Sequence, residues 1–404
     1  MQKGGPPPGR SSTTRRASPR CSAGTSRLRR VCQLRGLASA VGSCSSPASK
    51  RPCRGRPESL ACRRHGRSSV DGRHRGCMEP PATVGHVLAL YPLDRPRAVG
   101  AFDASTRNDN LRVVDAGGRQ FVLRRYRRNR DPERVRFQVR FQRHLEAYRF
   151  PSASAVEART ADPVVVDEEG FPWTLFEFVD GEHFDFSRPE QAREAGRRLA
   201  EFHDVADRFV GAATASLLED DVRRFVATPR AVVDELRDAF GIPSLELELQ
   251  NFRRRLETIA ASLHPERLDA LPAGWLHNDY HGRNMLFRDD AMVALLDFDK
   301  LERGPRASDI VRGVLSFARE RRGSRVLRPV FARGFLAGYR ERRGISAEEL
   351  AAMPALAELA FAPYAAICRM LQADHQDPVA HILGDLQGMR ETEAQCAALR
   401  QILV

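Results

Sequence analysis

Short apolar runs separated by polar turns mark the first patterned part of the chain. Residues 111–126 read LRVVDAGGRQFVLRRY, in which two β-rich runs flank an Asp and two glycines. Runs of this kind around a glycine-containing turn predict a β-hairpin. In residues 131–148, Val135 and Val139 belong to a helical spacing of apolar positions, which predicts a helix. Two more strand-like runs, PVVV and FPWTLFEF, follow, so we predict a small mixed region of strands around one helix.

From residue 189 the pattern changes to helical periodicity. The stretch PEQAREAGRRLAEFHDVADRF places Ala195, Leu199 and Phe202 on one face. Helical periodicity resumes over 228–262, where GIPS interrupts it. After residue 307 it covers nearly all of the chain, and the last helix is expected around 384–402. The pattern therefore predicts an α+β protein whose second part is mostly helical.

The positive charge of the chain gathers at its N-terminus. The formal net charge is +13, but residues 1–77 alone hold 18 Lys and Arg against two acids, and the remainder is nearly neutral. This segment is rich in Arg, Ser, Pro and Gly and lacks apolar periodicity, so we expect it to be disordered. It also holds six of the eight cysteines, at spacings typical of neither a zinc site nor a disulfide framework. Only Cys368 and Cys396 lie in the remainder, which suits the reducing cytoplasm.

Three interpretations of residues 1–77 stay open. An Arg- and Ser-rich, acid-poor leader resembles an organelle transit peptide. A basic tail could bind nucleic acid. The third interpretation is a start site assigned too early, because Met78 opens a sequence of different character. No apolar run approaches the ~20 residues of a membrane span. We therefore predict three parts: this extension, a nucleotide-binding lobe at 78–180 and a helical lobe at 181–404, with no membrane partner and no nucleic-acid partner unless the extension is real.

The stretch 277–299, HNDYHGRNMLFRDDAMVALLDFD, concentrates metal ligands and proton acceptors in few residues. Two chemistries use such a set. A two-His, one-carboxylate iron site would need a third ligand, such as His375, and a β-rich scaffold, which the helical flanks disfavour. Phosphoryl transfer instead needs an acceptor hydroxyl held in line, metal ions on the phosphates and cations on the charge that moves.

The second chemistry fits the spacing better. Asp279 lies five residues before Asn284, so one loop can aim a carboxylate at a substrate while an amide oxygen reaches Mg²⁺. Asp297 ends an apolar strand, where an unpaired carboxylate is costly to bury, and it offers the hard oxygen ligand that Mg²⁺ prefers. Asp299 is equally compatible with the metal site and with the surface. His281 is interpreted as a residue of local packing or solvent contact.

The segment HNDYHGRN...VALLDFDKLERGPRASDI resembles the catalytic segment of the aminoglycoside phosphotransferase and choline kinase-like superfamily, which includes homoserine kinases. The resemblance covers about 100–400 and implies a protein-kinase-like, bilobal fold. It implies that Asp279 is the catalytic carboxylate and that Asn284 and Asp297 hold Mg²⁺. It further implies that His277 shapes the loop and that Asp309 braces it from the next helix, where Asp309 could also cap that helix.

The nucleotide-binding half departs from this family. Kinases usually carry a Lys on the third strand, paired with a Glu on the following helix, whereas Arg124 stands at the strand position here. Arginine binds phosphate bidentately, so the exchange is chemically reasonable. Gln138 falls at the Glu position, with Glu133 one turn earlier as a substitute. Lys300, the one lysine after residue 77, lies beside the expected magnesium ligands.

The phosphate loop and the hinge can also be placed by the resemblance. GAFDASTRNDN has a single glycine, so Ser105, Thr106 and Asn108 would have to cover the phosphates. The run FEFVDG resembles the hinge, where backbone groups at Glu177 and Val179 would meet adenine.

These features predict an ATP- and Mg²⁺-dependent phosphotransferase acting on a hydroxyl of a small molecule. Homoserine, a sugar, an amino alcohol, an aminoglycoside or a protein hydroxyl all stay open as acceptors, as does GTP in place of ATP. The alternative is a weak or inactive kinase-like scaffold that binds nucleotide, which the departures at Arg124 and Gln138 keep open.

Overall fold

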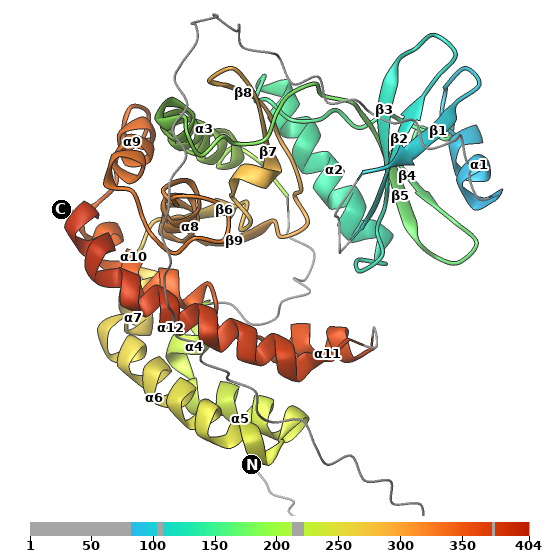
Figure 1. The fold of residues 1–404 in the computed structure, drawn as a ribbon. Coiled ribbons are helices and arrows are strands. Elements are labelled where there is room, and N and C mark those ends of the chain that lie inside the picture. The colour runs from blue at the N-terminus through green and yellow to red at the C-terminus, as the bar shows by residue number, and fades with distance from the viewer. Residues whose placement is uncertain (1–81, 103–107, 212–221, 374–375, 404) are drawn as a thin grey trace, which may run out of the picture. The chain divides into compact units, whose positions relative to one another are not determined.

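The structure is a computed structural model that describes residues 82–102, 108–211, 222–373 and 376–403 (Figure 1). All of these residues fall within one compact unit, residues 72–404. The extension at 1–77, which the sequence predicts to be disordered and whose targeting and nucleic-acid binding stay open, lies outside the described residues, as do Ser105, Thr106 and His375.

The first part of the described chain is built on a five-stranded sheet. Its spatial order is β1-β2-β3-β5-β4, with every neighbouring pair antiparallel. The predicted hairpin is confirmed: its two strands pair in register, and the Asp115 side chain accepts the Arg119 backbone N–H while Gly118 takes the left-handed turn conformation at φ 79°. The strands are β1 (Arg97–Ala101), β2 (Asp109–Val114), β3 (Gln120–Arg125), β4 (Val164–Val166) and β5 (Pro172–Glu177).

Two helices cover opposite faces of this sheet (Figure 1). Helix α1 (Ala82–Ala89) packs with Tyr91 on the face that carries Leu123 and Leu175. Helix α2 (Pro132–Ala147) is the helix that the sequence predicts, and Val135 and Val139 pack against the other face. It begins at a helix-favouring Pro, and Asp131 caps it by accepting the Glu133 N–H. The sequence pattern did not predict α1 or β1.

The rest of the described chain is mainly helical, as predicted. Helices α3 and α9 pack most closely, because Gly196 and Gly338 let the two backbones approach: a Cβ at Gly196 would lie 1.9 Å from the carbonyl oxygen of Phe335. Residues 360–364 split one expected helical run into α10 and α11, and the last helix begins at Pro378, before the expected start. The helices are α3 (Pro189–Ala206), α4 (Val222–Ala227), α5 (Pro229–Phe240), α6 (Glu246–Ser262), α7 (Pro265–Asp269), α8 (Ala307–Phe317), α9 (Pro329–Arg340), α10 (Ala347–Leu359), α11 (Ala365–Ala373) and α12 (Pro378–Leu403).

Two short antiparallel strand pairs lie among these helices and hold the charged loop. Strands β7 (Met285–Arg288) and β8 (Ala291–Leu295) form a short hairpin directly after the loop, and β8 is the apolar strand that the sequence predicts before Asp297. Strands β6 (Ala273–Leu276) and β9 (Glu302–Pro305) pair across 30 residues, which the sequence pattern did not predict. The loop leaves β6 and enters β7, so both of its ends are anchored by strand pairing.

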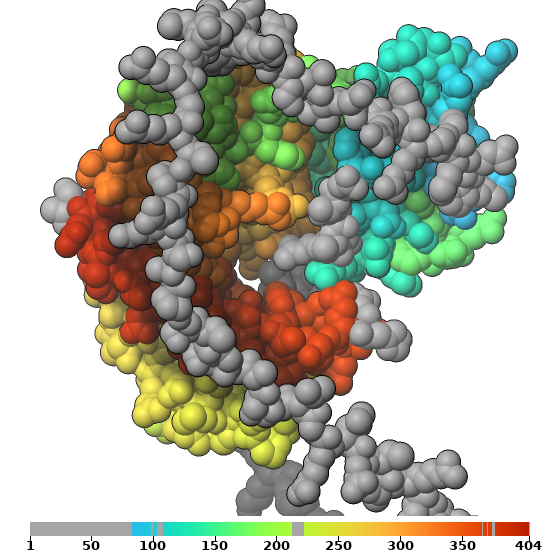
Figure 2. All heavy atoms as spheres, viewed as in Figure 1, coloured from blue at the N-terminus to red at the C-terminus, as the bar shows by residue number. Residues whose placement is uncertain are grey.

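One buried apolar cluster runs through the helical part and reaches the charged loop through Tyr280 and Phe298. In the space-filling view, the yellow residues of α5 and α6 lie beside the red residues of α12 (Figure 2), in agreement with the contact between α6 and α12. Within the described ranges, we find no helix that combines the length and apolar character of a membrane-spanning segment.

Candidate active site

The loop from His277 to Asn284 is fixed at its start by a buried carboxylate. Asp309, in the first turn of α8, accepts the backbone N–H groups of His277 at 2.7 Å and of Asn278 at 2.8 Å. Its side chain is fully buried, and His203 lies 3.5 Å away on the other side. Burial opposes ionisation of Asp309, but the hydrogen bond and charge of His203 and His277 leave its pKa below the ordinary value. The expected brace is therefore present, whereas the expected cap is wrong, because the N-cap position of α8 is Arg306.

Two side chains of the loop itself bind it to neighbouring segments. The imidazole Nε2 of His277 lies 3.0 Å from the backbone oxygen of Leu296, which ties the loop to the segment that precedes Asp297. Tyr280 is buried, and its hydroxyl donates to the backbone oxygen of Ala195 in α3 at 2.7 Å. Asn278 is at φ 60°, in the left-handed region that Asn adopts more readily than most residues, so the chain turns there at little cost. These contacts make the loop a rigid platform.

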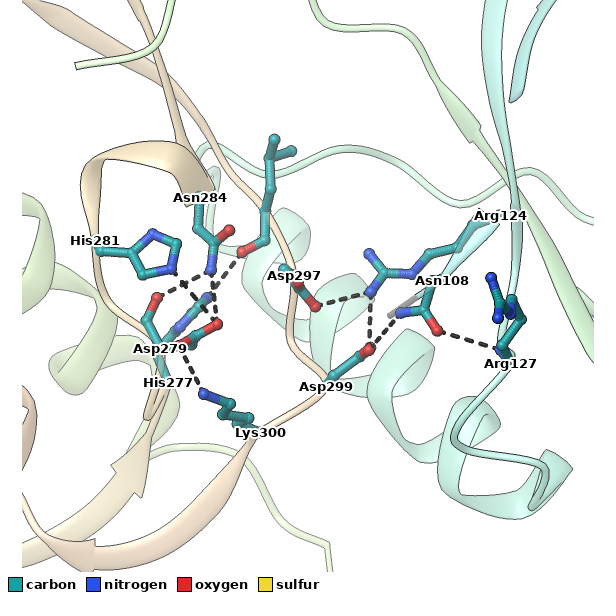
Figure 3. Close-up of polar contacts among 11 residues, drawn as sticks. Asn108, Arg124, Arg127, His277, Asp279, His281, Asn284, Asp297, Asp299 and Lys300 are labelled. Atoms are coloured by element: carbon teal, nitrogen blue, oxygen red, sulfur yellow. Dashed lines mark hydrogen bonds and ion pairs between the residues drawn. The ribbon is translucent and has the colours of Figure 1, made fainter. Parts of the chain in front are cut away.

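Asp279 stands at the centre of the platform and gathers three polar neighbours (Figure 3). Lys300 Nζ lies 2.8 Å from its Oδ1, and His281 Nε2 lies 3.6 Å from its Oδ2. Asn284 Nδ2 donates to the Asp279 backbone oxygen at 3.0 Å and to Oδ2 at 3.3 Å. Burial raises the pKa of Asp279, but the charges of Lys300 and His281 outweigh it and hold the pKa below the ordinary range. Asp279 is therefore ionised at neutral pH.

Asp297 follows β8 and faces the sheet of the first part of the chain. It is at φ 63°, so the chain turns sharply where the strand ends. Arg124 of β3 donates through Nη2 to Asp297 Oδ1 at 2.8 Å and to Asp299 Oδ2 at 2.8 Å (Figure 3). Burial opposes ionisation of both acids. The Arg124 charge keeps the pKa of Asp297 below its ordinary value, while burial together with the Asp297 charge raises the pKa of Asp299.

The prediction that Arg124 pairs with Gln138 or Glu133 of α2 is wrong. Glu133 pairs with Arg136 at 2.7 Å, and the buried Gln138 has an Nε2 atom without a hydrogen-bond partner. Helix α2 instead reaches the site through Arg134, whose Nη2 donates to the backbone oxygen of Leu301 at 2.6 Å. The reason is electrostatic: Gln138 carries no charge to hold a guanidinium, whereas Asp297 and Asp299 present two carboxylates to it.

Asn108 adds a contact from the β1–β2 side of the sheet. Its Nδ2 donates to Asp299 Oδ2 at 2.7 Å, and its Oδ1 accepts the Arg127 backbone N–H at 3.3 Å. The side chain is almost fully buried, at 2% exposure. The resemblance predicts that Asn108 covers the phosphates. In the structure, the Asn108 side chain donates to the carboxylate of Asp299.

The hinge residues lie at the end of β5. Glu177 donates its backbone N–H to the Ser154 oxygen at 2.8 Å and carries an exposed side chain, and Phe178 donates to the Gln120 oxygen at 3.1 Å. The Phe178 bond and the pairing of Glu177 with Phe121 hold this end of β5 against β3, the strand that carries Arg124. The role of Glu177 and Val179 in contacting adenine stays a prediction.

The donor set suits a hard cation. Asn284 uses its amide nitrogen on Asp279, which directs the amide oxygen away from that carboxylate, and Asp297 contributes carboxylate oxygen. Amide and carboxylate oxygens are the ligands that Mg²⁺ prefers, and Mg²⁺ would supply charge neutralisation on phosphates at this place. In contrast, no cluster of three His, Cys, Asp or Glu side chains fit to hold a metal occurs among the described residues, so they give the iron interpretation no support.

Comparison with known proteins decides the family. The model of the phosphotransferase enzyme family matches residues 99–345, more than half of the chain and the whole of the site. This chain belongs to the phosphotransferase enzyme family. A homoserine kinase from Phenylobacterium zucineum is 28% identical over 276 residues, which are 68% of this chain and 80% of that protein. The resemblance stated from the sequence is thus confirmed.

Solved structures agree on the fold of this phosphotransferase family member. A microcompartment-associated aminopropanol kinase superposes with a TM-score of 0.57 at 18% identity, covering 80% of this chain and all of that chain. The amicoumacin kinase hAmiN, solved with AMP-PNP, Ca²⁺ and Ami, superposes with a TM-score of 0.55 at 15% identity, covering 78% of this chain and 93% of that chain. The predicted α+β, protein-kinase-like fold with a β-sheet lobe and a mostly helical lobe is confirmed.

Three side chains of the site had no firm assignment from sequence. The sequence places Lys300 beside the expected magnesium ligands without giving it a role, leaves Asp299 between the metal site and the surface, and gives no role to Arg134. A signal existed for Lys300, because it is the single lysine after residue 77 and lies three residues after Asp297. Asp385 of α12 pairs with His381 at 3.3 Å, and burial raises its pKa, which the charges of His381 and Lys300 oppose.

Proposed function

We propose that this member of the phosphotransferase enzyme family transfers the γ-phosphoryl group of ATP to a hydroxyl of a small molecule, with Mg²⁺ as the metal. The observation that carries the proposal is the convergence of Asp279, Asn284 and Asp297, which come from one loop and the strand after it, with Lys300 and Arg124 as the adjacent cations. Phosphoryl transfer depends on such positioning and charge stabilisation more than on covalent chemistry.

Each group has one proposed task. Asp279 is ionised and orients the acceptor hydroxyl, then accepts its proton as the oxygen–phosphorus bond forms. Asn284 and Asp297 hold Mg²⁺ through oxygen atoms. Arg124 places a fixed positive charge beside Asp297 on the side of the sheet, where the nucleotide phosphates are expected. Glu177 and Val179 offer backbone groups to adenine. His277 and Asp309 keep the loop in place through backbone hydrogen bonds.

The acceptor is proposed to be a small molecule with a free hydroxyl. Relatives and structural neighbours include kinases named for homoserine and for aminopropanol. Each of these two compounds carries an amino group and a hydroxyl group. Amino alcohols and hydroxy amino acids are therefore the first acceptors to test, with sugars and aminoglycosides next.

The experiment is Mg²⁺-dependent ATP turnover by the full chain across that acceptor panel, with GTP as a second donor. Asp279→Asn should lower acceptor-stimulated turnover by about 10²- to 10⁴-fold, the range of a positioned general base. The matched control is Asp289→Asn: Asp289 is exposed, lies in the β7–β8 turn at φ 55°, and Asn accepts that conformation. Equal acceptor-stimulated turnover in wild type and Asp279→Asn would contradict the role of Asp279, and nucleotide binding without turnover in wild type would favour a kinase-like scaffold.

A further inference from the structure

Lys300 occupies a place that the family assignment does not explain. It is the single lysine between residue 78 and the C-terminus, among a large excess of arginines. Its ammonium lies 2.8 Å from Asp279 Oδ1, on the catalytic carboxylate itself, and its side chain is 27% exposed. A partly exposed ammonium keeps access to a ligand while it stays in contact with the acid. A lysine placed only for surface charge would not need this position.

The second cation of the site is already engaged elsewhere. Arg124 donates through Nη2 to both Asp297 and Asp299, so its charge lies on the metal-binding side of the site. In Figure 3, Arg124 and Lys300 reach the acids from different directions, Arg124 from the sheet and Lys300 from the segment after β8. The site thus divides its positive charge: one cation faces Asp297 and Asp299, and the other faces Asp279.

From this division we propose that Lys300 is a catalytic residue that contacts the γ-phosphoryl group while it passes to the acceptor. The proposal rests on the proposed function and adds a residue to it. An ammonium has three donors, so Lys300 can keep one hydrogen bond to Asp279 and give another to a phosphoryl oxygen. Because the acceptor hydroxyl must approach both Asp279 and the phosphorus, a cation on Asp279 lies beside the path of transfer.

Transfer of the γ-phosphoryl group forms one bond and breaks one bond. The acceptor oxygen forms a bond to phosphorus as the bond between phosphorus and the β,γ-bridging oxygen breaks, and that electron pair leaves on ADP. The hydroxyl proton passes to the Asp279 carboxylate and then to water. Lys300 neither gains nor loses a proton, and it stabilises the negative charge on the phosphoryl oxygens throughout.

The first test measures binding and requires no acceptor. The affinities of AMP-PNP and ADP, both with Mg²⁺, are determined by calorimetry for the full chain as wild type, Lys300→Met and Lys300→Arg, with Arg340→Met as a control. Arg340 is an exposed cation at the end of α9. Lys300→Met should lose about tenfold in affinity for AMP-PNP and stay within about twofold for ADP, since only AMP-PNP carries a γ-phosphoryl group. Lys300→Arg should keep most of the preference, and Arg340→Met should resemble wild type.

The outcomes distinguish a failure of the proposed function from a failure of the role proposed for Lys300. If wild type binds neither nucleotide, the proposed function fails and the role of Lys300 fails with it. If wild type binds both nucleotides and Lys300→Met loses both equally or neither, the inference alone is wrong, and Lys300 is a structural partner of Asp279.

A second measurement is made on the unmodified sequence and uses the conservative variant Lys300→Arg only to assign one signal. The chain has three lysines, Lys3, Lys50 and Lys300, so ¹⁵N-lysine labelling gives few side-chain signals, and Lys300→Arg identifies one of them. The Lys300 Nζ signal should shift with AMP-PNP and Mg²⁺ and shift less with ADP and Mg²⁺. Equal shifts with the two nucleotides would contradict contact with the γ-phosphoryl group.

Discussion

Arg124 and Asp297 are 173 residues apart in the chain and form a 2.8 Å ion pair in which the guanidinium also contacts Asp299. A positive charge therefore stands beside the proposed magnesium ligand before any metal binds. Since two carboxylates meet one guanidinium, removal of the arginine leaves two like charges close together with no compensation.

Arg124→Met should destabilise the protein, by about 1–3 kcal/mol in a partly exposed cluster, and should make it more responsive to Mg²⁺. The reason is that Mg²⁺ can restore the missing positive charge between Asp297 and Asp299. The measurement is the unfolding midpoint with and without Mg²⁺ in wild type and variant. A smaller Mg²⁺-dependent rise in the variant than in wild type would mean that Arg124 helps the metal to bind. Arg127→Met, on an exposed side chain of the same sheet region, is the matched control.

Asn108 and Asp299 should act as a pair. Their hydrogen bond, 2.7 Å long and partly buried, joins the β2 region to the segment after Asp297. Asn108→Ala leaves a buried acceptor of Asp299 without this donor and should cost about 1–2 kcal/mol. In a double-mutant cycle with Asp299→Asn, the two effects should be non-additive, with a coupling of at least about 0.5 kcal/mol in unfolding free energy. Strict additivity would show that the contact contributes nothing.

Asp309 should make the stability of the protein depend on pH in the acid range. Burial opposes its charge, but His203, His277 and the loop amides keep its folded-state pKa below the unfolded value. A lowered pKa means that the stabilisation is complete above the unfolded pKa, about 4, and is lost as the pH falls through the folded value. Wild type should exceed Asp309→Asn in unfolding free energy at pH 7, and the difference should shrink below about pH 4. Chemical unfolding at pH 7, 5, 4 and 3.5 tests this, and a constant difference would refute it.

Gly282 should be required for the shape of the catalytic loop. A Cβ at this position would lie 2.5 Å from the Cβ of Phe184, a buried residue that cannot move freely. Gly282→Ala should therefore cost about 1–3 kcal/mol of stability and reduce turnover, because the loop and the segment that carries Phe184 would have to separate. Gly85→Ala in α1 is the control, since a Cβ there meets no atom within 4 Å and Ala favours a helix. Thermal unfolding of both variants, with turnover, gives the comparison.

Periodicity and turn chemistry along the chain were sufficient for most elements. The β2–β3 hairpin, α2, α3 and the β7–β8 hairpin follow from alternation, helical spacing and turn glycines, all of which are local properties. Elements that depend on remote partners were missed. The β6–β9 pairing is one: its strands are 4 residues each and are stable only because they pair with each other across the loop.

The sequence by itself determined the candidate residues for the proposed chemistry, because Asp279, Asn284 and Asp297 lie within one loop and the hairpin that follows it. The tertiary structure decided the partners of those residues. The expected pairing of Arg124 with α2 gives way to Asp297 and Asp299, Lys300 meets Asp279, and Asp309 bonds loop amides over 30 residues away. Ion pairs of this kind, and hydrogen bonds from a side chain to backbone N–H groups, join segments far apart in the chain. Their formation depends on how the packed core places the segments, and no local pattern encodes that placement.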